Sequence, residues 1–200
     1  MPLLTKQICP RCHQPSPSGA THPRCQNRLV KFSGIVSLYP YPSIVGQMIR
    51  DYKYESVFKL EEDLIDLAVR GLERSQKLLS FWKDKEFIFM PVPLYIAKRI
   101  FRGYDQADKL ISGAAKRLNL IYSNEILFRR KWTSQQSKLP KKERSKNVSN
   151  AFGVNDKSLV RGKNFVLFDD VYTTGSTLRS AASVLKSAGA GQIWGLTLCR

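Results

Sequence analysis

The sequence is short of acidic residues: 16 Asp and Glu stand against 33 Lys and Arg, which gives a net charge of +17 over 200 residues. An excess of this size attracts polyanions, so nucleic acid, phosphorylated small molecules and acidic membrane surfaces are candidate partners. The sequence also lacks any apolar run near the roughly 18 residues that span a bilayer. Residues 1–9 show no apolar core followed by a small-residue cleavage site. We therefore expect a cytoplasmic protein with no membrane span.

Cysteine is scarce, and three of the four cysteines lie in the first 25 residues. Cys9 and Cys12 form a C-x-x-C pair, and His22 and Cys25 form an H-x-x-C pair after a spacer rich in Pro, Ser and Gly. In a cytoplasmic chain this clustering favours a metal over disulfides. Three thiolates and one imidazole suit a closed, tetrahedral, structural Zn²⁺ site. His13 is the second candidate for the fourth ligand, and a metal-free leader with free thiols is the alternative.

The fourth cysteine, Cys199, stands alone in the sequence at the end of an apolar segment. An isolated cysteine in such a place usually behaves as a small buried hydrophobe. We therefore leave it out of the metal site.

The rest of the chain has globular composition, with 42% hydrophobic and 10% aromatic residues. Residues 1–30 are polar and aperiodic, which predicts a small metal-stabilised module ahead of one larger domain at residues 31–200. Within that domain, strands and helices alternate, which indicates an α/β fold with a mainly parallel sheet. Strands are predicted at residues 35–39, 86–90, 126–129, 165–168 and 193–198, and helices at residues 43–54, 57–79, 106–118 and 176–188.

The most informative stretch runs from Phe165 to Thr177 and reads F-V-L-F-D-D-V-Y-T-T-G-S-T. An apolar strand ends in Asp169 and Asp170, and a turn of small residues then leads into a helix. Unpaired amides and the helix dipole at such a helix N-terminus favour a phosphate, and the two carboxylates suit ribose hydroxyls or Mg²⁺. The alternative is a capped turn without a ligand. The turn residues are Thr173, Thr174, Gly175, Ser176 and Thr177.

This segment resembles the phosphoribosyl-diphosphate (PRPP) binding motif of type I phosphoribosyltransferases, which has four apolar residues, two acids, two variable residues and T-T-G-S-T. The resemblance implies their fold for residues 31–200, a parallel sheet flanked by helices. It also implies that Asp169 and Asp170 contact the ribose hydroxyls of PRPP and act as the catalytic acids. The loop at residues 173–177 would hold the 5′-phosphate, and Mg²⁺ would accompany PRPP.

The order of motifs along the whole chain is similar to that of the ComF family of competence proteins. The cysteine-rich start, Lys53-Tyr54 after the first helix and the loop 91–94 with its following cations all match. The family usually carries a second C-x-x-C where this chain has His22, which leaves the fourth metal ligand open. The resemblance implies a role in handling single-stranded DNA during natural transformation, with a competence helicase as a further candidate partner.

Two groups of cations accompany these motifs. Lys98, Arg99 and Arg102 follow the loop 91–94, and we expect them to meet pyrophosphate or DNA phosphates. A solvated helix face is the alternative. A second group lies in the basic segment 129–146, which could close over PRPP, follow a DNA backbone or remain a solvated loop. Its candidate DNA-binding residues are Arg129, Arg130, Lys131, Lys141, Lys142 and Arg144.

Three functions are consistent with these patterns. The first is a PRPP-binding, phosphoribosyltransferase-like protein that acts in DNA uptake. The second is a salvage enzyme that transfers ribose 5-phosphate from PRPP to a nucleobase acceptor. The third is a DNA-binding adaptor that has lost its ligand, and the adjacent pair Asp169 and Asp170 argues against it, because a scaffold has no need of two neighbouring carboxylates.

Overall fold

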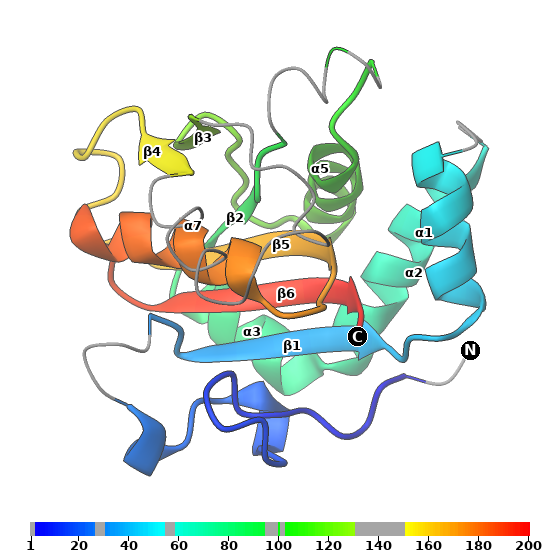
Figure 1. The fold of residues 1–200 in the computed structure, drawn as a ribbon, viewed down its shortest axis with the longest axis horizontal. Coiled ribbons are helices and arrows are strands. Elements are labelled where there is room, and N and C mark those ends of the chain that lie inside the picture. The colour runs from blue at the N-terminus through cyan, green and yellow to red at the C-terminus, as the bar shows by residue number, and fades with distance from the viewer. Residues whose placement is uncertain (1–2, 27–30, 55–58, 95–99, 101–102, 131–150) are drawn as a thin grey trace, which may run out of the picture.

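A parallel four-stranded sheet forms the centre of the computed structural model, which describes residues 3–26, 31–54, 59–94, 100, 103–130 and 151–200. The strands are β1 (Gly34–Tyr39), β2 (Ile88–Pro91), β5 (Phe165–Val171) and β6 (Ile193–Cys199), in the order β1-β6-β5-β2 (Figure 1). The two central strands are nearly continuous apolar runs, as expected for strands covered on both faces. The predicted α/β fold with a parallel sheet is confirmed.

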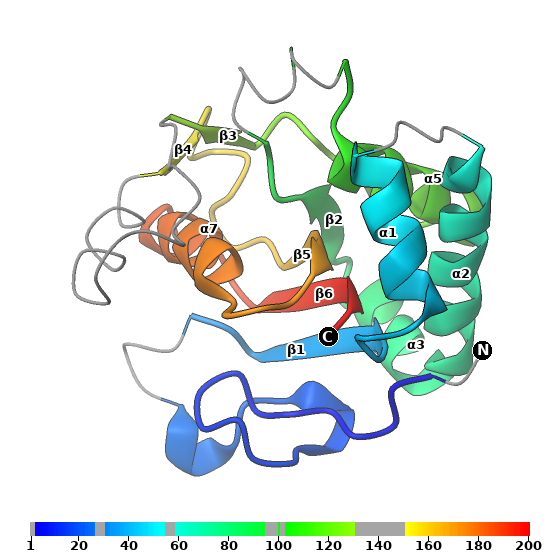
Figure 2. The ribbon, with the colours of Figure 1, turned by 45° about the vertical axis from the view of Figure 1, so that its right-hand side comes forward.

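Helices cover both faces of this sheet (Figure 2). On one face pack α1 (Ile44–Tyr54), α2 (Leu60–Arg74), α3 (Gln76–Asp84) and α5 (Gln106–Leu118). On the other lies α7 (Ser176–Ser187), beside a two-stranded antiparallel ribbon of β3 (Leu127–Arg129) and β4 (Phe152–Val154). Because α1 and α7 lie on opposite faces, their ends can approach the same strand ends of the sheet from two sides.

The structure corrects the prediction of one long helix over residues 57–79. The helix is interrupted at Ser75, whose φ of −97° and ψ of 42° are not helical, and α3 then continues to Asp84. The break redirects the chain so that Trp82 packs edge-on against Phe89 and Trp194, with ring centroids 5.6 and 5.8 Å apart. Burial of a large aromatic therefore outweighs the local preference for a continuous helix.

Two strand predictions also change. The strand predicted at residues 86–90 begins later, because Glu86 has a φ of +49° and the first residue paired in the sheet is Ile88. The strand predicted to end at Phe168 continues to Val171, since Asp169 pairs with Thr197 of β6. Asp169 and Asp170 therefore belong to the last residues of a paired strand, and the hydrogen bonds to β6 hold their backbone in place. The short strand β4 was missed by the sequence prediction.

The N-terminal segment lies along the outer edge of β1, which is an edge strand of the sheet (Figure 1). The N–H of Leu4 donates to the carbonyl of Leu38 at 2.8 Å. The side chain of Gln7 donates to the carbonyl of Ser37 and accepts from its N–H, at 2.8 and 3.0 Å. The segment thus satisfies backbone groups that would otherwise invite pairing with another chain.

Within the residues that the structure describes, we find no helix with the length and apolarity needed to cross a membrane.

Candidate functional site

A pocket of about 210 Å³ opens at the carboxyl ends of β5 and β2. Chain segments far apart in the sequence meet there, at the edge where α/β sheets bind ligands. They are the end of α1, the loop after β2, the start of α5, the end of β3, the end of β5 and the start of α7. Its polar lining includes Lys53, Gln106, Arg129, Asp169, Asp170 and Thr177.

The two predicted carboxylates, Asp169 and Asp170, lie in this pocket, which we call the carboxylate pocket. Beside them lies a lysine that sequence reasoning did not place in the site. Asp170 is buried, and its Oδ2 lies 2.5 Å from Nζ of Lys53, in the last turn of α1. The N–H of Asp170 donates to Oδ1 of Asp169 at 3.0 Å. Burial and the neighbouring charge of Asp170 raise the pKa of Asp169 to about 7, although Lys53 and Arg129 act in the opposite direction.

Arg129, at the end of β3, supplies the second cation of the pocket. Its guanidinium lies over the ring of Phe152, 5.3 Å from the centroid. Burial lowers the pKa of Arg129, and the charge of Asp169 opposes that shift. Two carboxylates and two cations therefore share the pocket. Such a balanced set can accept hydrogen bonds from sugar hydroxyls while presenting positive charge to phosphate.

The predicted phosphate loop, residues 173–177, leads directly into α7. Gly175 has a φ of +67°, and a Cβ at this position would come within 2.5 Å of the Tyr172 ring. The N–H of Ser176 donates to Oγ1 of Thr174 at 3.4 Å, and the guanidinium of Arg179 donates to the carbonyl of Thr174 at 2.6 Å. The first turn of α7 carries no acidic residue, so its N-terminus keeps the positive end of the dipole that favours an anion.

The loop after β2 reaches the same pocket through Val92, Pro93 and Leu94. The N–H of Leu94 donates to Oδ2 of Asp105 at 2.9 Å, and Oδ1 of Asp105 accepts from the N–H of Asp108 as the N-cap of α5. One carboxylate thus fixes the loop and starts the helix. Sequence reasoning missed this residue, although an Asp three residues before another Asp at a helix start is a recognisable capping signal.

Several predicted cations fall outside the described residues: Lys98, Arg99, Arg102, Lys131, Lys141, Lys142 and Arg144. Of the predicted DNA-binding residues, Arg129 and Arg130 are described, and they point to different places. Arg129 lines the carboxylate pocket. Arg130 lies over the Phe128 ring and lines a separate hollow of about 330 Å³ between β4 and α7.

Four N-terminal side chains come together as the spacing predicts. The ligand atoms of Cys9, Cys12, His22 and Cys25 all lie within 4.8 Å of one another, and Sγ of Cys12 is 3.4 Å from Nδ1 of His22. The other ring nitrogen of His22 lies 3.0 Å from the carbonyl of Pro15. That contact favours a proton on Nε2 and leaves Nδ1 as a metal ligand, which is a common arrangement around zinc.

These four donors can bind a metal, and their three sulfurs and one nitrogen match the donor set of a closed structural zinc site. His13 is exposed and lies outside the cluster, with a φ of +59°. The geometry therefore favours His22 as the fourth ligand. Cys199 is fully buried in β6, as expected for a small hydrophobe.

Comparison with known proteins places this arrangement in a family. Residues 102–200 match the family model described as a phosphoribosyl transferase domain. The chain is 33% identical over 178 residues to Competence protein F of Haemophilus influenzae, covering 86% of this chain and 76% of that protein. It is 26% identical to DNA utilization protein YhgH of Escherichia coli K12, over 98% of this chain and 85% of that protein. It is 28% identical to Competence protein ComFC of Bacillus subtilis, over 98% of this chain and 79% of that protein.

Among solved structures, a hypoxanthine phosphoribosyltransferase from Staphylococcus aureus is similar, with a TM-score of 0.43 and 15% identity over 68% of this chain and 62% of that one. The sequence matches carry the assignment without it, because the Haemophilus protein is matched over most of both chains. The chain therefore belongs to the ComF family of competence proteins and contains a phosphoribosyltransferase-like domain.

Proposed function

We propose that this protein binds PRPP in the carboxylate pocket and handles single-stranded DNA during natural transformation. The observation that carries the first half is the meeting of Asp169, Asp170, Lys53 and Arg129 beside the phosphate loop. A ligand with adjacent hydroxyls and phosphates at both ends of a ribose matches acids flanked by cations and a helix N-terminus.

In this proposal Asp169 and Asp170 accept hydrogen bonds from the ribose hydroxyls, and residues 173–177 hold the 5′-phosphate. Lys53 and Arg129 neutralise charge near the pyrophosphate, with Lys98, Arg99 and Arg102 as further candidates from the sequence. Mg²⁺ bound with PRPP would screen the pyrophosphate charge, and its natural protein ligands are carboxylate oxygens such as those of Asp169 and Asp170.

The domain division at residues 1–30 and 31–200 is part of the proposal. We assign Zn²⁺ to Cys9, Cys12, His22 and Cys25 as a structural ion. The support is the four-donor cluster, together with the contacts by which Leu4 and Gln7 lie on the edge of β1. Zinc would therefore hold the module that covers this edge strand.

Two observations support the proposal that the protein binds single-stranded DNA: the names of its relatives and the hollow between β4 and α7. Proteins named for competence and DNA utilization match nearly the whole chain. The hollow presents Arg130 and Lys157 beside the hydroxyls of Ser183 and Ser187, a set that suits DNA phosphates. Lys131, Lys141, Lys142 and Arg144 extend the proposed DNA contacts along the sequence. From the family resemblance we also propose that the protein acts in the cytoplasm and that a competence helicase is its partner.

A second candidate function, phosphoribosyl transfer to a nucleobase, is favoured by one observation. Burial and Asp170 raise the pKa of Asp169 to about 7, where a carboxyl can exchange a proton at neutral pH. Release of pyrophosphate from PRPP in the presence of a panel of nucleobases separates this activity from binding alone. A signal with one base and wild-type protein, absent in Asp169→Asn, identifies a transferase.

Ligand-induced stabilisation and salt-dependent DNA binding test the two halves of the main proposal. PRPP with Mg²⁺ at about 100 times its Kd should add about 2.7 kcal/mol, or roughly 5–10 °C in Tm. Labelled single-stranded DNA should bind with an affinity that falls as salt rises. Arg130→Gln with Lys157→Gln should lower the salt slope, whereas Lys116→Gln on the exposed face of α5 should not. DNA binding without salt dependence contradicts the phosphate contacts.

A further inference from the structure

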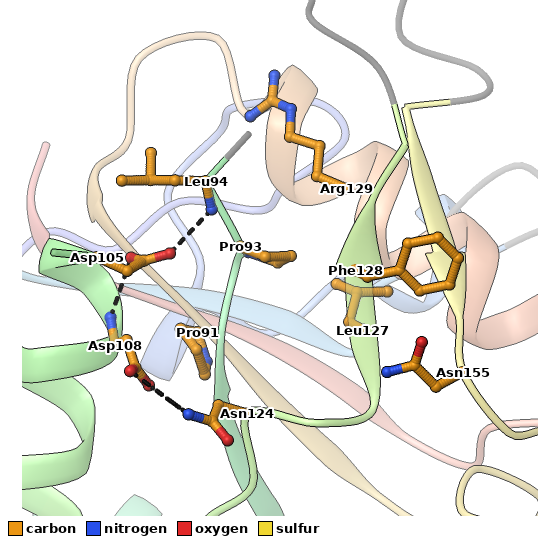
Figure 3. A pocket seen from close by; sticks show the side chains of 10 residues that line it. All are labelled: Pro91, Pro93, Leu94, Asp105, Asp108, Asn124, Leu127, Phe128, Arg129 and Asn155. Atoms are coloured by element: carbon orange, nitrogen blue, oxygen red, sulfur yellow. Dashed lines mark hydrogen bonds between the residues drawn. The ribbon is translucent and has the colours of Figure 1, made fainter. Parts of the chain in front are cut away.

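Asp105 joins two segments that line the carboxylate pocket. Its Oδ2 accepts from the N–H of Leu94 at 2.9 Å, and its Oδ1 accepts from the N–H of Asp108, in the first turn of α5, at 3.3 Å. Leu94 and Gln106, the residue that follows Asp105, both line the carboxylate pocket. Asp105 itself lines a neighbouring hollow of about 210 Å³ (Figure 3). Asp105 can therefore influence a ligand of the carboxylate pocket through Leu94 and the start of α5.

The loop after β2 has few backbone donors, and the sheet already uses one of them. Pro91 and Pro93 have no N–H, and the N–H of Val92 donates to the carbonyl of Phe168 in β5 at 2.8 Å. Within residues 91–94 the N–H of Leu94 is the one donor that remains, and Asp105 accepts it. This hydrogen bond ties down the loop where it leaves the sheet.

The other side of Asp105 is connected to the sheet as well. Figure 3 shows hydrogen bonds that run from Asp105 through Asp108 to Asn124. Next to Asn124, the N–H of Ser123 donates to the carbonyl of Phe89 in β2 at 3.0 Å. The carboxylate of Asp105 therefore holds the loop against a helix start that is itself anchored.

The wall that Asp105 holds in place lies where one end of PRPP would bind. In the proposed complex, residues 173–177 hold the 5′-phosphate, and Asp169 and Asp170 hold the ribose hydroxyls. The pyrophosphate is attached at the opposite end of the ribose, so it extends away from the phosphate loop toward the wall formed by the loop after β2 and the start of α5. A wall that is already ordered costs the ligand less free energy on binding.

We propose that Asp105 is a positioning residue for the pyrophosphate end of PRPP: its carboxylate holds the loop after β2 against α5 and orders this wall before the ligand arrives. The inference rests on the proposed PRPP site. Charge and positioning predict opposite effects here. As a negative charge near an anion site, Asp105 would weaken pyrophosphate binding, and its removal would strengthen it. As a positioning residue, its removal weakens that binding.

Asp105→Ser separates the tie to the loop from the cap of α5. Serine is a preferred N-cap residue, so it can still accept from the N–H of Asp108. Its single oxygen cannot also accept from the N–H of Leu94. The helix should therefore persist while the loop loses its tie, and the Tm of the variant confirms that it is folded. Asp156→Ser is the matched control, since Asp156 is exposed and accepts from the N–H of Ser158 at 2.7 Å.

Three ligands locate the effect within the pocket. We would titrate the zinc-loaded full chain with PRPP, with pyrophosphate and with ribose 5-phosphate, each in the presence of Mg²⁺. Asp105→Ser should raise the Kd for PRPP and for pyrophosphate at least roughly tenfold and leave that for ribose 5-phosphate within about twofold. Asp156→Ser should bind all three ligands as the wild type does.

The alternative outcomes are distinct. An equal loss of affinity for ribose 5-phosphate and PRPP in folded Asp105→Ser would mean a general structural role and overturns the inference. Unchanged or tighter binding of pyrophosphate by this variant also overturns it, and the proposed PRPP site then stands, because the wild type still binds PRPP. Failure of the folded wild type to bind PRPP is a different result, since it removes the proposed function and the inference together.

Discussion

The ammonium of Lys53 lies 2.5 Å from Oδ2 of Asp170, and it joins the end of α1 to the end of β5. Both side chains are largely shielded, with exposures of 20% and 12%, so their attraction is weakly screened. In the sequence the two residues belong to distant segments. Their pairing brings Lys53 into the site, where its positive charge offsets part of the negative charge that an incoming phosphate meets.

Removal of this lysine should weaken PRPP binding. In Lys53→Met the pocket keeps two carboxylates but only one described cation, Arg129, so an anionic ligand meets net negative charge. The Kd for PRPP with Mg²⁺ should rise at least about tenfold, and Lys53→Arg should retain most of the affinity. Lys83→Met, on the exposed face of α3, serves as the control in the same calorimetric titration.

The opposite result would have a definite meaning. If Lys53→Met binds PRPP more tightly than the wild type, Lys53 occupies the place of the ribose hydroxyls and must leave before the ligand enters.

The raised pKa of Asp169 predicts a pH-dependent stability. The folded pKa is about 7, above the ordinary 3.8 of the unfolded chain, so the folded state binds the proton more tightly. Stability from this group is present below about pH 4 and is lost as pH rises to about 7. Asp169→Asn has no carboxyl group to ionise, so its stability should not fall in this way, and the variant should gain on the wild type across pH 4–7, by at most about 4 kcal/mol at pH 8. Urea unfolding at several pH values measures this, and a constant difference contradicts it.

Two glycines with similar backbone angles separate strain from function. Gly175 and Gly162 have φ of +67° and +73°, so alanine at either position should cost about 1 kcal/mol in backbone strain. A Cβ at Gly175 would also strike Tyr172, whereas nothing lies within 4 Å of one at Gly162. Gly175→Ala should therefore distort the phosphate loop and lose at least about tenfold in PRPP affinity, while Gly162→Ala should bind normally. Equal affinities would remove residues 173–177 from the site.

Zinc content distinguishes the two histidines. His22→Ala should lose the metal, because its Nδ1 faces the sulfur of Cys12, and His13→Ala should keep one zinc per chain. Loss of zinc should also speed hydrogen exchange at the N–H of Ser37, which donates to the side chain of Gln7 in the N-terminal segment. Mass spectrometry of intact and chelator-treated protein measures both effects. Zinc retained in His22→Ala and lost in His13→Ala would reverse the ligand assignment.

The sequence predicts the features whose logic is local. The phosphate loop is recognisable because an apolar strand, two acids, a small-residue turn and a helix follow one another at residues 165–188. The metal cluster is recognisable because its two pairs have ligand spacing, and the structure does bring Cys9, Cys12, His22 and Cys25 together. In both cases neighbours along the chain are also neighbours in space.

The sequence did not predict the features that depend on tertiary packing. Lys53 enters the site only because α1 packs on the face of the sheet that places its last turn over β5. The break at Ser75 depends on where Trp82 finds its aromatic partners. The separate destinations of Arg129 and Arg130 follow from the alternation of side chains along a strand, which a charge count does not register.

The most direct test is a calorimetric titration of zinc-loaded protein with PRPP and Mg²⁺, run beside Asp169→Asn. The account predicts micromolar, one-to-one binding by the wild type and a loss of at least about tenfold in the variant, since the amide replaces a charged acceptor of ribose hydroxyls. An unchanged Kd in Asp169→Asn, or no binding by folded wild-type protein, would contradict the claim that the pocket at the end of β5 is a PRPP site.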